Sequence, residues 1–150
     1  MVDEIRFCSP EGKWGFLSPY AAFPIKVEVD GSVYTFPSVE HYYQAMKFYA
    51  TDERFRTILN LKNPDDARII TKKPEYKINR REDFESNKFA IMEKALRAKF
   101  FQNVVAAEML KATGNALLIK SCKICYKCGF GEGCGENSMG KIMMKIREEL

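Results

Sequence analysis

The stretch that decides the fold is Phe36-Pro37-Ser38-Val39-Glu40-His41-Tyr42-Tyr43-Gln44-Ala45-Met46-Lys47-Phe48. Pro37 ends an extended run, and Ser38 is a good N-cap for a helix that begins at Val39. At about 100° per residue, Glu40, Gln44 and Lys47 fall within about 60° of one another on that helix. We therefore expect one short helix to present a carboxylate, an amide and an amine in a column.

The same helix also has an apolar side. The residues that form a stripe beside the column are Val39, Tyr43, Met46 and Ala50. Glu40 lies in the first turn, where the helix dipole favours the charged form of its carboxyl group. Taken alone, Glu near a helix start and Lys near its end is also ordinary helix electrostatics. His41, the only histidine, we interpret as a packed or surface residue and not as a ligand or base.

Length and composition predict one folded domain over residues 1–150. The chain is 46% hydrophobic and 13% aromatic, which excludes a disordered protein. Its formal charge of +4 suits an anionic ligand or a transient contact with nucleic acid. No apolar run reaches transmembrane length, and Met1-Val2-Asp3-Glu4-Ile5-Arg6 lacks the apolar core of a signal peptide. We therefore expect a cytoplasmic protein with no membrane contact.

Strand signals precede the helix. Ile25–Val29 and Ser32–Phe36 alternate apolar and polar residues, and Asp30-Gly31 between them is typical of a two-residue hairpin turn. Two further short strands are expected at Ile5–Cys8 and Leu117–Lys120. The hairpin leads through Pro37 directly into the helix that carries the column.

The remainder of the chain is mostly helical. Asn63 and Pro64 form a start signal, and Asp83 is expected to cap the longest helix. The expected helices are Asp52–Leu61, Pro64 to about Lys72, Asp83 to about Phe101, Val104–Ala112, and a last one that Asn137 or Ser138 caps and that ends at Glu149. Lys72–Arg81 is expected to be a basic loop. The predicted fold class is α+β, dominated by helices, with a small antiparallel hairpin.

A loop rich in cysteine and glycine precedes the last helix. The thiols of Cys122, Cys125, Cys128 and Cys134 have the local spacing of a metal site. Structural zinc usually uses two separated pairs, so we favour thiols without metal, and we expect no cofactor. With Cys8 the count is five, and in a reducing compartment a disulfide framework is not expected.

Glycines alternate in the same loop. Gly129, Gly131, Gly133 and Gly135 lead into the helix start at Asn137, as in loops that bring backbone N–H groups to a phosphate. These residues are therefore candidate phosphate-binding groups.

The order of several motifs resembles the YbiA-like family, also called NADAR. The motifs are Phe16-Leu17-Ser18, Ala21-Ala22-Phe23-Pro24-Ile25, Asp30-Gly31, Pro37 to Phe48, Lys94-Ala95-Leu96-Arg97-Ala98-Lys99-Phe100, Thr113-Gly114 and Gly133-x-Gly135-x-Asn137-x-x-Gly140. The resemblance extends from about Phe7 to Leu150. Family members are N-glycosidases that cleave ribosylamino-pyrimidine intermediates of riboflavin synthesis or remove ADP-ribose from guanine.

The resemblance implies roles for particular residues. The family's catalytic glutamate falls on Glu40, and its lysine, proposed to react with the anomeric carbon of the ribose, falls on Lys47. Cleavage of a C1–N bond passes through an oxocarbenium-like state, which a nearby carboxylate stabilises. A lysine desolvated among aromatic rings is more often neutral and nucleophilic. The substrate-binding residues implied are Ser18, Tyr43, Gln44, Arg81, Phe84, Gly129, Gly131, Gly133 and Asn137.

This chain also departs from the family pattern. The departures are Pro19, Ile70-Thr71, Phe84 in place of a tryptophan, Lys120, Cys125 and Cys128-Gly129. The expected function is hydrolysis of the bond between a phosphorylated ribose and a base or amino-pyrimidine, with ADP-ribosylated guanine among the candidate substrates. The alternatives are an ADP-ribose- or nucleotide-binding module without turnover and an interaction domain stabilised by metal in the cysteine loop.

Overall fold

The computed structural model of the chain describes residues 3–121 and 137–150. The α-helices in this part are α1 (Val39–Ala45), α2 (Glu53–Leu59), α3 (Pro64–Ile70), α4 (Pro74–Lys77), α5 (Phe84–Gln102), α6 (Val104–Lys111) and α8 (Ser138–Glu149). The strands are β1 (Glu4–Phe7), β2 (Ile25–Val29), β3 (Ser32–Phe36) and β4 (Leu117–Lys120), and a 3-10 turn spans Gly15–Leu17. The predicted α+β class, dominated by helices, is confirmed. None of the helices described is long and apolar enough to cross a membrane.

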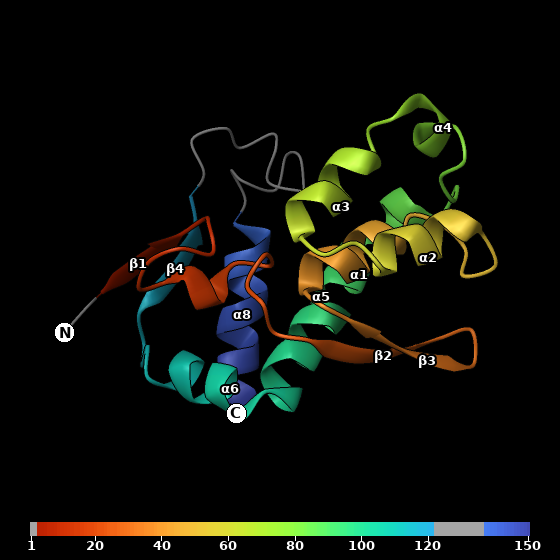
Figure 1. The fold of residues 1–150 in the computed structure, drawn as a ribbon. Coiled ribbons are helices and arrows are strands. Elements are labelled where there is room, and N and C mark those ends of the chain that lie inside the picture. Colours follow the sequence, from red (N-terminus) through yellow and green to blue (C-terminus); the bar gives the residue numbers. More distant parts are fainter. Residues whose placement is uncertain (1–2, 122–136) are drawn as a thin grey trace.

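The strands form two separate pairs. β2 and β3 make the predicted antiparallel hairpin, with Ile25 opposite Phe36. Asp30 and Gly31 both have positive φ, 51° and 86°, as the two-residue turn requires. β1 pairs in parallel with β4, from the far end of the sequence, and this pairing was not predicted. The two pairs lie on opposite sides of α8 (Figure 1).

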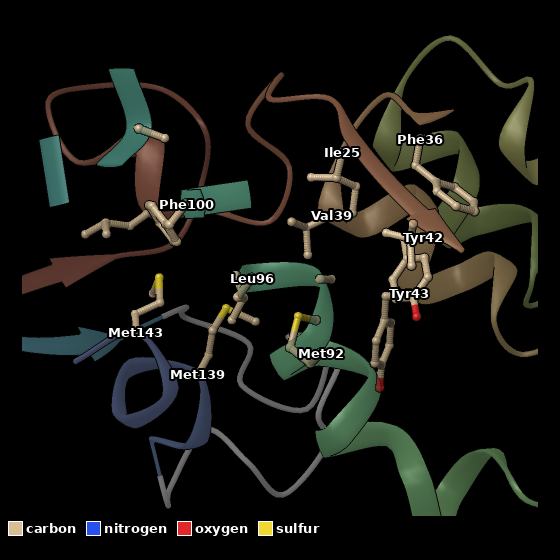
Figure 2. Close-up of a cluster of buried hydrophobic side chains, with 14 of the residues drawn as sticks. Ile25, Phe36, Val39, Tyr42, Tyr43, Met92, Leu96, Phe100, Met139 and Met143 are labelled. Carbon is tan, nitrogen blue, oxygen red and sulfur yellow. The ribbon is translucent and has the colours of Figure 1, made fainter. Parts of the chain in front are cut away.

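The core is built around α5. Figure 2 shows Met92, Leu96 and Phe100 of this helix between the methionines of α8 and the aromatic side chains of α1. The labelled partners are Met139 and Met143 on α8, and Val39, Tyr42 and Tyr43 on α1. Phe36 of β3 packs edge-to-face on Tyr42, with the ring centroids 5.1 Å apart. α1 is therefore held on its apolar side by the hairpin and by α5.

The predicted helix starts are confirmed at three caps. Ser38, Asp52 and Asn63 each accept a backbone N–H of the following turn, at 3.2, 3.0 and 3.2 Å. The prediction for Asp83 is half right, because α5 begins after it but its carboxylate pairs with Arg81 at 3.0 Å and caps nothing. The side chain of Asn137 likewise makes no cap; it bonds to Leu118 O and Lys120 N of β4, at 2.8 and 3.0 Å.

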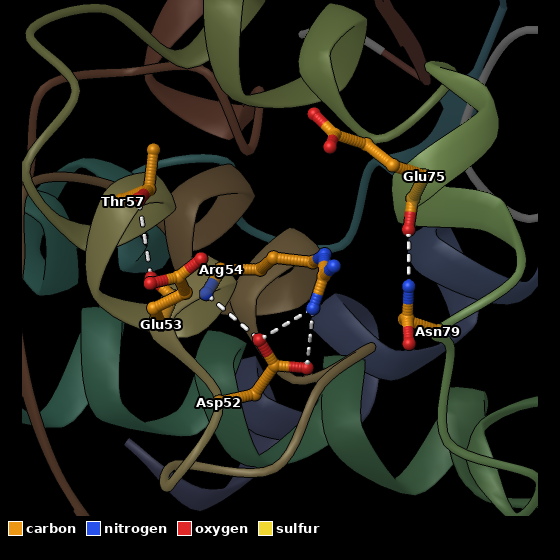
Figure 3. A network of polar contacts seen from close by, with 6 residues as sticks. All are labelled: Asp52, Glu53, Arg54, Thr57, Glu75 and Asn79. Carbon is orange, nitrogen blue, oxygen red and sulfur yellow. Dashed lines mark hydrogen bonds and ion pairs between the residues drawn. The ribbon is translucent and has the colours of Figure 1, made fainter.

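The segment predicted as a basic loop is partly helical. Pro74 occupies the first turn of α4, where its missing N–H costs no hydrogen bond, and Asn79 donates to Glu75 O at 2.7 Å (Figure 3). Asp52 accepts two bonds from the Arg54 guanidinium in the same view, at 2.9 and 3.2 Å. That guanidinium lies 5.8 Å from the ring centroid of the buried Tyr76. The segment is therefore packed against α2.

The cysteine predictions have different outcomes. The expectation of a free thiol is wrong at Cys8, which is disulfide-bonded. Cys122, Cys125, Cys128 and Cys134 lie outside the described residues, as do Gly129, Gly131 and Gly133. Within residues 3–121 and 137–150, no group of three or more His, Cys, Asp or Glu side chains is placed to hold a metal ion.

Candidate active site

The structure brings Glu40 and Gln44 together on the buried face of α1. The Gln44 side-chain amide donates to Glu40 Oε2 at 2.6 Å, and only 3% of Glu40 is exposed. The hydroxyl of Thr71, the cap residue that follows α3, lies 3.0 Å from Gln44 Oε1 and 2.9 Å from Arg68 O, so the two oxygens share its one proton. The amide is thus held at both ends, and it fixes the carboxylate in one position.

Burial is the largest influence on the pKa of the Glu40 carboxyl group. Desolvation raises its pKa, and the Gln44 hydrogen bond and the charges of Lys47, Lys120 and Arg68 oppose this rise. Desolvation therefore outweighs the predicted stabilisation of the ionised Glu40 carboxylate by the helix dipole. A carboxyl group with a raised pKa holds a proton more readily, which suits it to proton transfer near neutral pH.

Lys47 lies just beyond the end of α1. Its Nζ is 5.6 Å from the ring centroids of both Tyr43 and Phe84. Burial, and secondarily the positive charge of Arg80, lowers the pKa of this lysine to about 8 against the opposing charge of Glu40. A substantial share of the amine is therefore neutral near pH 8, and a neutral amine is nucleophilic. The expected desolvation among aromatic rings is confirmed.

His41 serves the helix start instead of the column. Its Nδ1 lies 2.7 Å from Ser38 Oγ, and its Nε2 lies 2.9 Å from Leu61 O. The side chain is fully buried, and burial lowers its pKa. The interpretation of His41 as a packed residue is confirmed.

Three other predicted binding residues support the column. Tyr43 and Phe84 are both buried and pack edge-to-face, with centroids 5.3 Å apart, so that they form an aromatic wall beside Lys47. Ser18 is fully buried; its hydroxyl accepts from Tyr20 N at 3.1 Å and its carbonyl accepts from Lys99 Nζ at 2.9 Å. Ser18 thus anchors the loop whose next residue, Pro19, accepts the backbone N–H of Glu40 at 3.0 Å.

The side chain of Arg81 is paired with Asp83. Two of its guanidinium nitrogens bond to Asp83, each at 3.0 Å, and the group lies 4.5 Å from the ring centroid of Tyr49. It also borders a cavity of about 260 Å³ that Tyr42 and Phe84 line and that neither Glu40 nor Lys47 reaches. A contact between Arg81 and a substrate phosphate therefore stays a prediction.

Several polar and charged residues near the column were not predicted as site residues. Tyr20, Arg68 and Arg80 were given no role in the site, and Thr71 and Lys120 were treated only as departures from the family. Arg68 hydrogen-bonds to Tyr20, and burial together with the charge of Glu40 raises the pKa of that phenol. Arg68 and Thr71 are three residues apart at the end of α3, a spacing that places them on one side of the chain. This periodicity was the available signal.

Comparison with known proteins identifies the family. The NADAR domain model matches residues 6–150. The N-glycosidase YbiA of Escherichia coli (strain K12) is 38% identical over 148 residues, which are 97% of this chain and 88% of that protein. A riboflavin biosynthesis protein of Vibrio vulnificus is 36% identical over 151 residues, which are 100% of this chain and 39% of that protein.

A solved structure agrees with these sequence matches. The NMR structure of Escherichia coli YbiA is similar with a TM-score of 0.80 and 36% identity, over 99% of this chain and 86% of that one. The likeness therefore covers the hairpin, the column on α1 and the helices packed around it. The chain belongs to the NADAR family.

Proposed function

We propose that the protein is an N-glycosidase that hydrolyses the C1–N bond between a phosphorylated ribose and a base or amino-pyrimidine. The observation that carries the proposal is that Glu40 and Lys47 are both buried and that the charge of each acts on the pKa of the other. Burial raises the pKa of the carboxyl group and lowers that of the amine to about 8, so the two pKa values lie closer together than those of an exposed carboxyl group and an exposed amine. The names of the two curated relatives, an N-glycosidase and a riboflavin biosynthesis protein, support this reaction class.

Glu40 has an electrostatic role and a proton-transfer role. As the C1–N bond breaks, positive charge develops on C1 and the ring oxygen of the ribose. The ionised carboxylate stabilises this charge in a site from which water is largely excluded. The amide of Gln44, fixed by Thr71, keeps the carboxylate oxygen aimed while the charge develops.

Lys47 supplies the nucleophile. Its neutral Nζ forms a bond to C1 while the C1–N bond to the base breaks, and the base leaves with the bonding electron pair and a proton that the protonated carboxyl group of Glu40 donates, which leaves Glu40 ionised. Glu40 accepts a proton from the new C1–Nζ ammonium group. Opening of the ribose ring then gives a Schiff base, which water hydrolyses to the free sugar and the regenerated amine. Atoms and charge balance with water as the only co-reactant.

The surroundings of the column suit such a substrate. Tyr43 and Phe84, the latter in the place of a family tryptophan, are buried against each other and exclude water from the side of Lys47. The basic segment 72–81 favours a diphosphate or a substrate carried on DNA. Gly129, Gly131, Gly133 and the helix start at Asn137 remain candidates for backbone contacts to phosphate. Arg81 remains a candidate for a side-chain contact.

Base release measured by chromatography tests the proposal. The wild-type protein, Glu40→Gln and the exposed control Glu108→Gln are each incubated with ADP-ribosylated guanine DNA and with a phosphorylated ribosylamino-pyrimidine. We expect release from one substrate by the wild type and by Glu108→Gln, and none by Glu40→Gln. Equal release by Glu40→Gln, or tight binding of ADP-ribose by a wild type that releases no base, would contradict the proposal. The latter result would favour a binding module.

A further inference from the structure

We infer that Arg80 is the residue whose guanidinium binds the anionic group of the substrate beside Lys47, a role that the family resemblance implies for its neighbour Arg81. The inference rests on the proposed function, because it names the group that holds the phosphate end of that substrate. It starts from a difference between two adjacent arginines that precede α5: the guanidinium of Arg81 is bonded to Asp83, whereas Nε of Arg80 has no hydrogen-bond partner among the described residues.

Arg80 is tied to the column through Thr71. Its Nη2 donates to Thr71 O at 3.4 Å, and the hydroxyl of the same threonine donates to Gln44 Oε1 at 3.0 Å. Gln44 in turn donates to Glu40. The guanidinium therefore belongs to the same hydrogen-bonded series as the catalytic carboxyl group.

One donor of this guanidinium is left over. Arg80 Nε is buried and has no hydrogen-bond partner among the described residues. A buried N–H group without a partner is destabilising, more so when it carries charge, and native proteins rarely keep one without a reason. An oxygen of a bound phosphate would accept this bond and remove that cost.

The positive charges of Lys47 and Arg80 repel each other. After burial, the charge of Arg80 is the largest influence that lowers the pKa of Lys47, and Lys72 acts in the same direction. Glu40 and Glu85 are the acidic groups that oppose them. Two cations that repel each other across a site are both stabilised by an anion placed between them. Arg80 thus does two things: it binds the anion, and it keeps Lys47 partly neutral before binding.

Arg81 already has its partners. Its Nε and Nη2 are both bonded to Asp83, and its charge lies over the ring of Tyr49. Its backbone N–H donates to Lys47 O at 2.8 Å, so Arg81 contributes to the position of Lys47 through the main chain. Binding a phosphate through its side chain would first require breaking the pair with Asp83.

The ligand is a phosphate oxyanion linked to ribose. A guanidinium is suited to it because Nε–H and Nη–H form a planar fork that matches two phosphate oxygens, whereas an ammonium offers a point charge. The diphosphate of ADP-ribose and the monophosphate of ribose 5-phosphate share this chemistry. The two sources are separated by using both as probes.

The test compares Arg80→Gln with Arg81→Gln. Arg56→Gln, at an exposed arginine of α2, controls for the loss of one positive charge. Calorimetry measures the affinity for ADP-ribose and for ribose 5-phosphate, and NMR of ¹³C-methylated lysines measures the pKa of Lys47. We expect Arg80→Gln to weaken the affinity for the preferred probe by about 10- to 100-fold. We also expect it to raise the pKa of Lys47.

Arg80→Lys keeps the test valid if the glutamine variant does not fold. It retains the charge but not the fork, so the pKa of Lys47 should stay low while affinity still falls. The inference is overturned if Arg81→Gln weakens binding at least as much as Arg80→Gln, if the pKa of Lys47 does not respond to Arg80→Gln, or if the wild type binds neither probe. Because neither assay needs turnover, a wild type that binds a probe but releases no base refutes the proposed function alone.

Discussion

Lys99 provides a quantitative test of the core beside the site. Its side chain is fully buried on α5, where Nζ donates to Ser18 O at 2.9 Å and lies 5.4 and 5.2 Å from the ring centroids of Phe23 and Phe100. Burial, and secondarily the charge of Lys120, lowers the pKa of this lysine to about 7. We consider the substitution Lys99→Met, which keeps the length of the side chain and removes its charge.

The magnitude follows from the two pKa values of Lys99. An unfolded lysine has a pKa near 10.4, and each unit of difference is worth about 1.4 kcal/mol, so burying the charged amine opposes folding by about 5 kcal/mol. This penalty is complete below pH 7, where Lys99 is charged in both states. Between pH 7 and about 10.4 the unfolded chain binds more protons than the folded one, so the free energy of unfolding rises by about 1.4 kcal/mol per unit.

The methionine variant has no such pH dependence, but it leaves the Ser18 carbonyl without its donor, at a cost of about 1–3 kcal/mol. We therefore expect Lys99→Met to be more stable than the wild type by about 2–4 kcal/mol at pH 6. That advantage should shrink by about 3 kcal/mol between pH 7 and pH 9.

Urea unfolding at several pH values measures this difference. The exposed Lys141→Met on α8 serves as the control and should show no pH-dependent difference from the wild type. A difference between Lys99→Met and the wild type that stays constant from pH 6 to pH 9 would refute the low pKa of Lys99. A lower stability of the variant at pH 6 would refute the claim that its charge is costly.

Three further predictions concern the site and its support. Gly140→Ala would place a Cβ against the backbone oxygen of Leu118 with no room between them, so we expect the free energy of unfolding in urea to fall by at least about 1–3 kcal/mol. The exposed Lys141→Ala is the control, and wild-type stability of Gly140→Ala would contradict the packing of α8 on β4. Glu40→Gln removes a negative charge that raises the pKa of Lys47, so NMR of methylated lysines should give a pKa below the present value of about 8, and a higher one would refute the coupling. Thr71→Val removes the hydroxyl that bonds to Gln44 Oε1, so we expect the free energy of unfolding to fall by about 1–3 kcal/mol and base release to be slower. Unchanged base release would show that the Gln44 amide positions Glu40 without the bond from Thr71.

Local features of this fold were predictable from the sequence. The caps at Ser38, Asp52 and Asn63 and the turn at Asp30-Gly31 depend on residues within a few positions of one another. The shared face of Glu40 and Gln44 follows from the helical period in the same way.

Features that depend on distant partners were not predictable. β1 and β4 pair across more than a hundred residues, and no local pattern chooses a partner at that distance. Asp83 and Asn137 occupy helix starts as predicted, but their side chains do not cap the helices. The carboxylate of Asp83 is paired with Arg81, and the amide of Asn137 is hydrogen-bonded to strand β4. Arg80 and Arg81 look alike in the sequence, and only the positions of Thr71 and Asp83 separate them.

The central claim is that the amine of Lys47 attacks C1 of the ribose, while Glu40 stabilises the positive charge that develops on the sugar and transfers the protons of the reaction. The most direct test is trapping with borohydride during turnover, followed by digestion and mass spectrometry of the lysine-containing peptides. We expect a ribose-derived mass on the peptide that contains Lys47, and none in Lys47→Ala. Lys99 is an internal control, because its pKa is also low but its amine is enclosed in the core. Base release without an adduct on Lys47, or an adduct on another lysine instead, would contradict the claim.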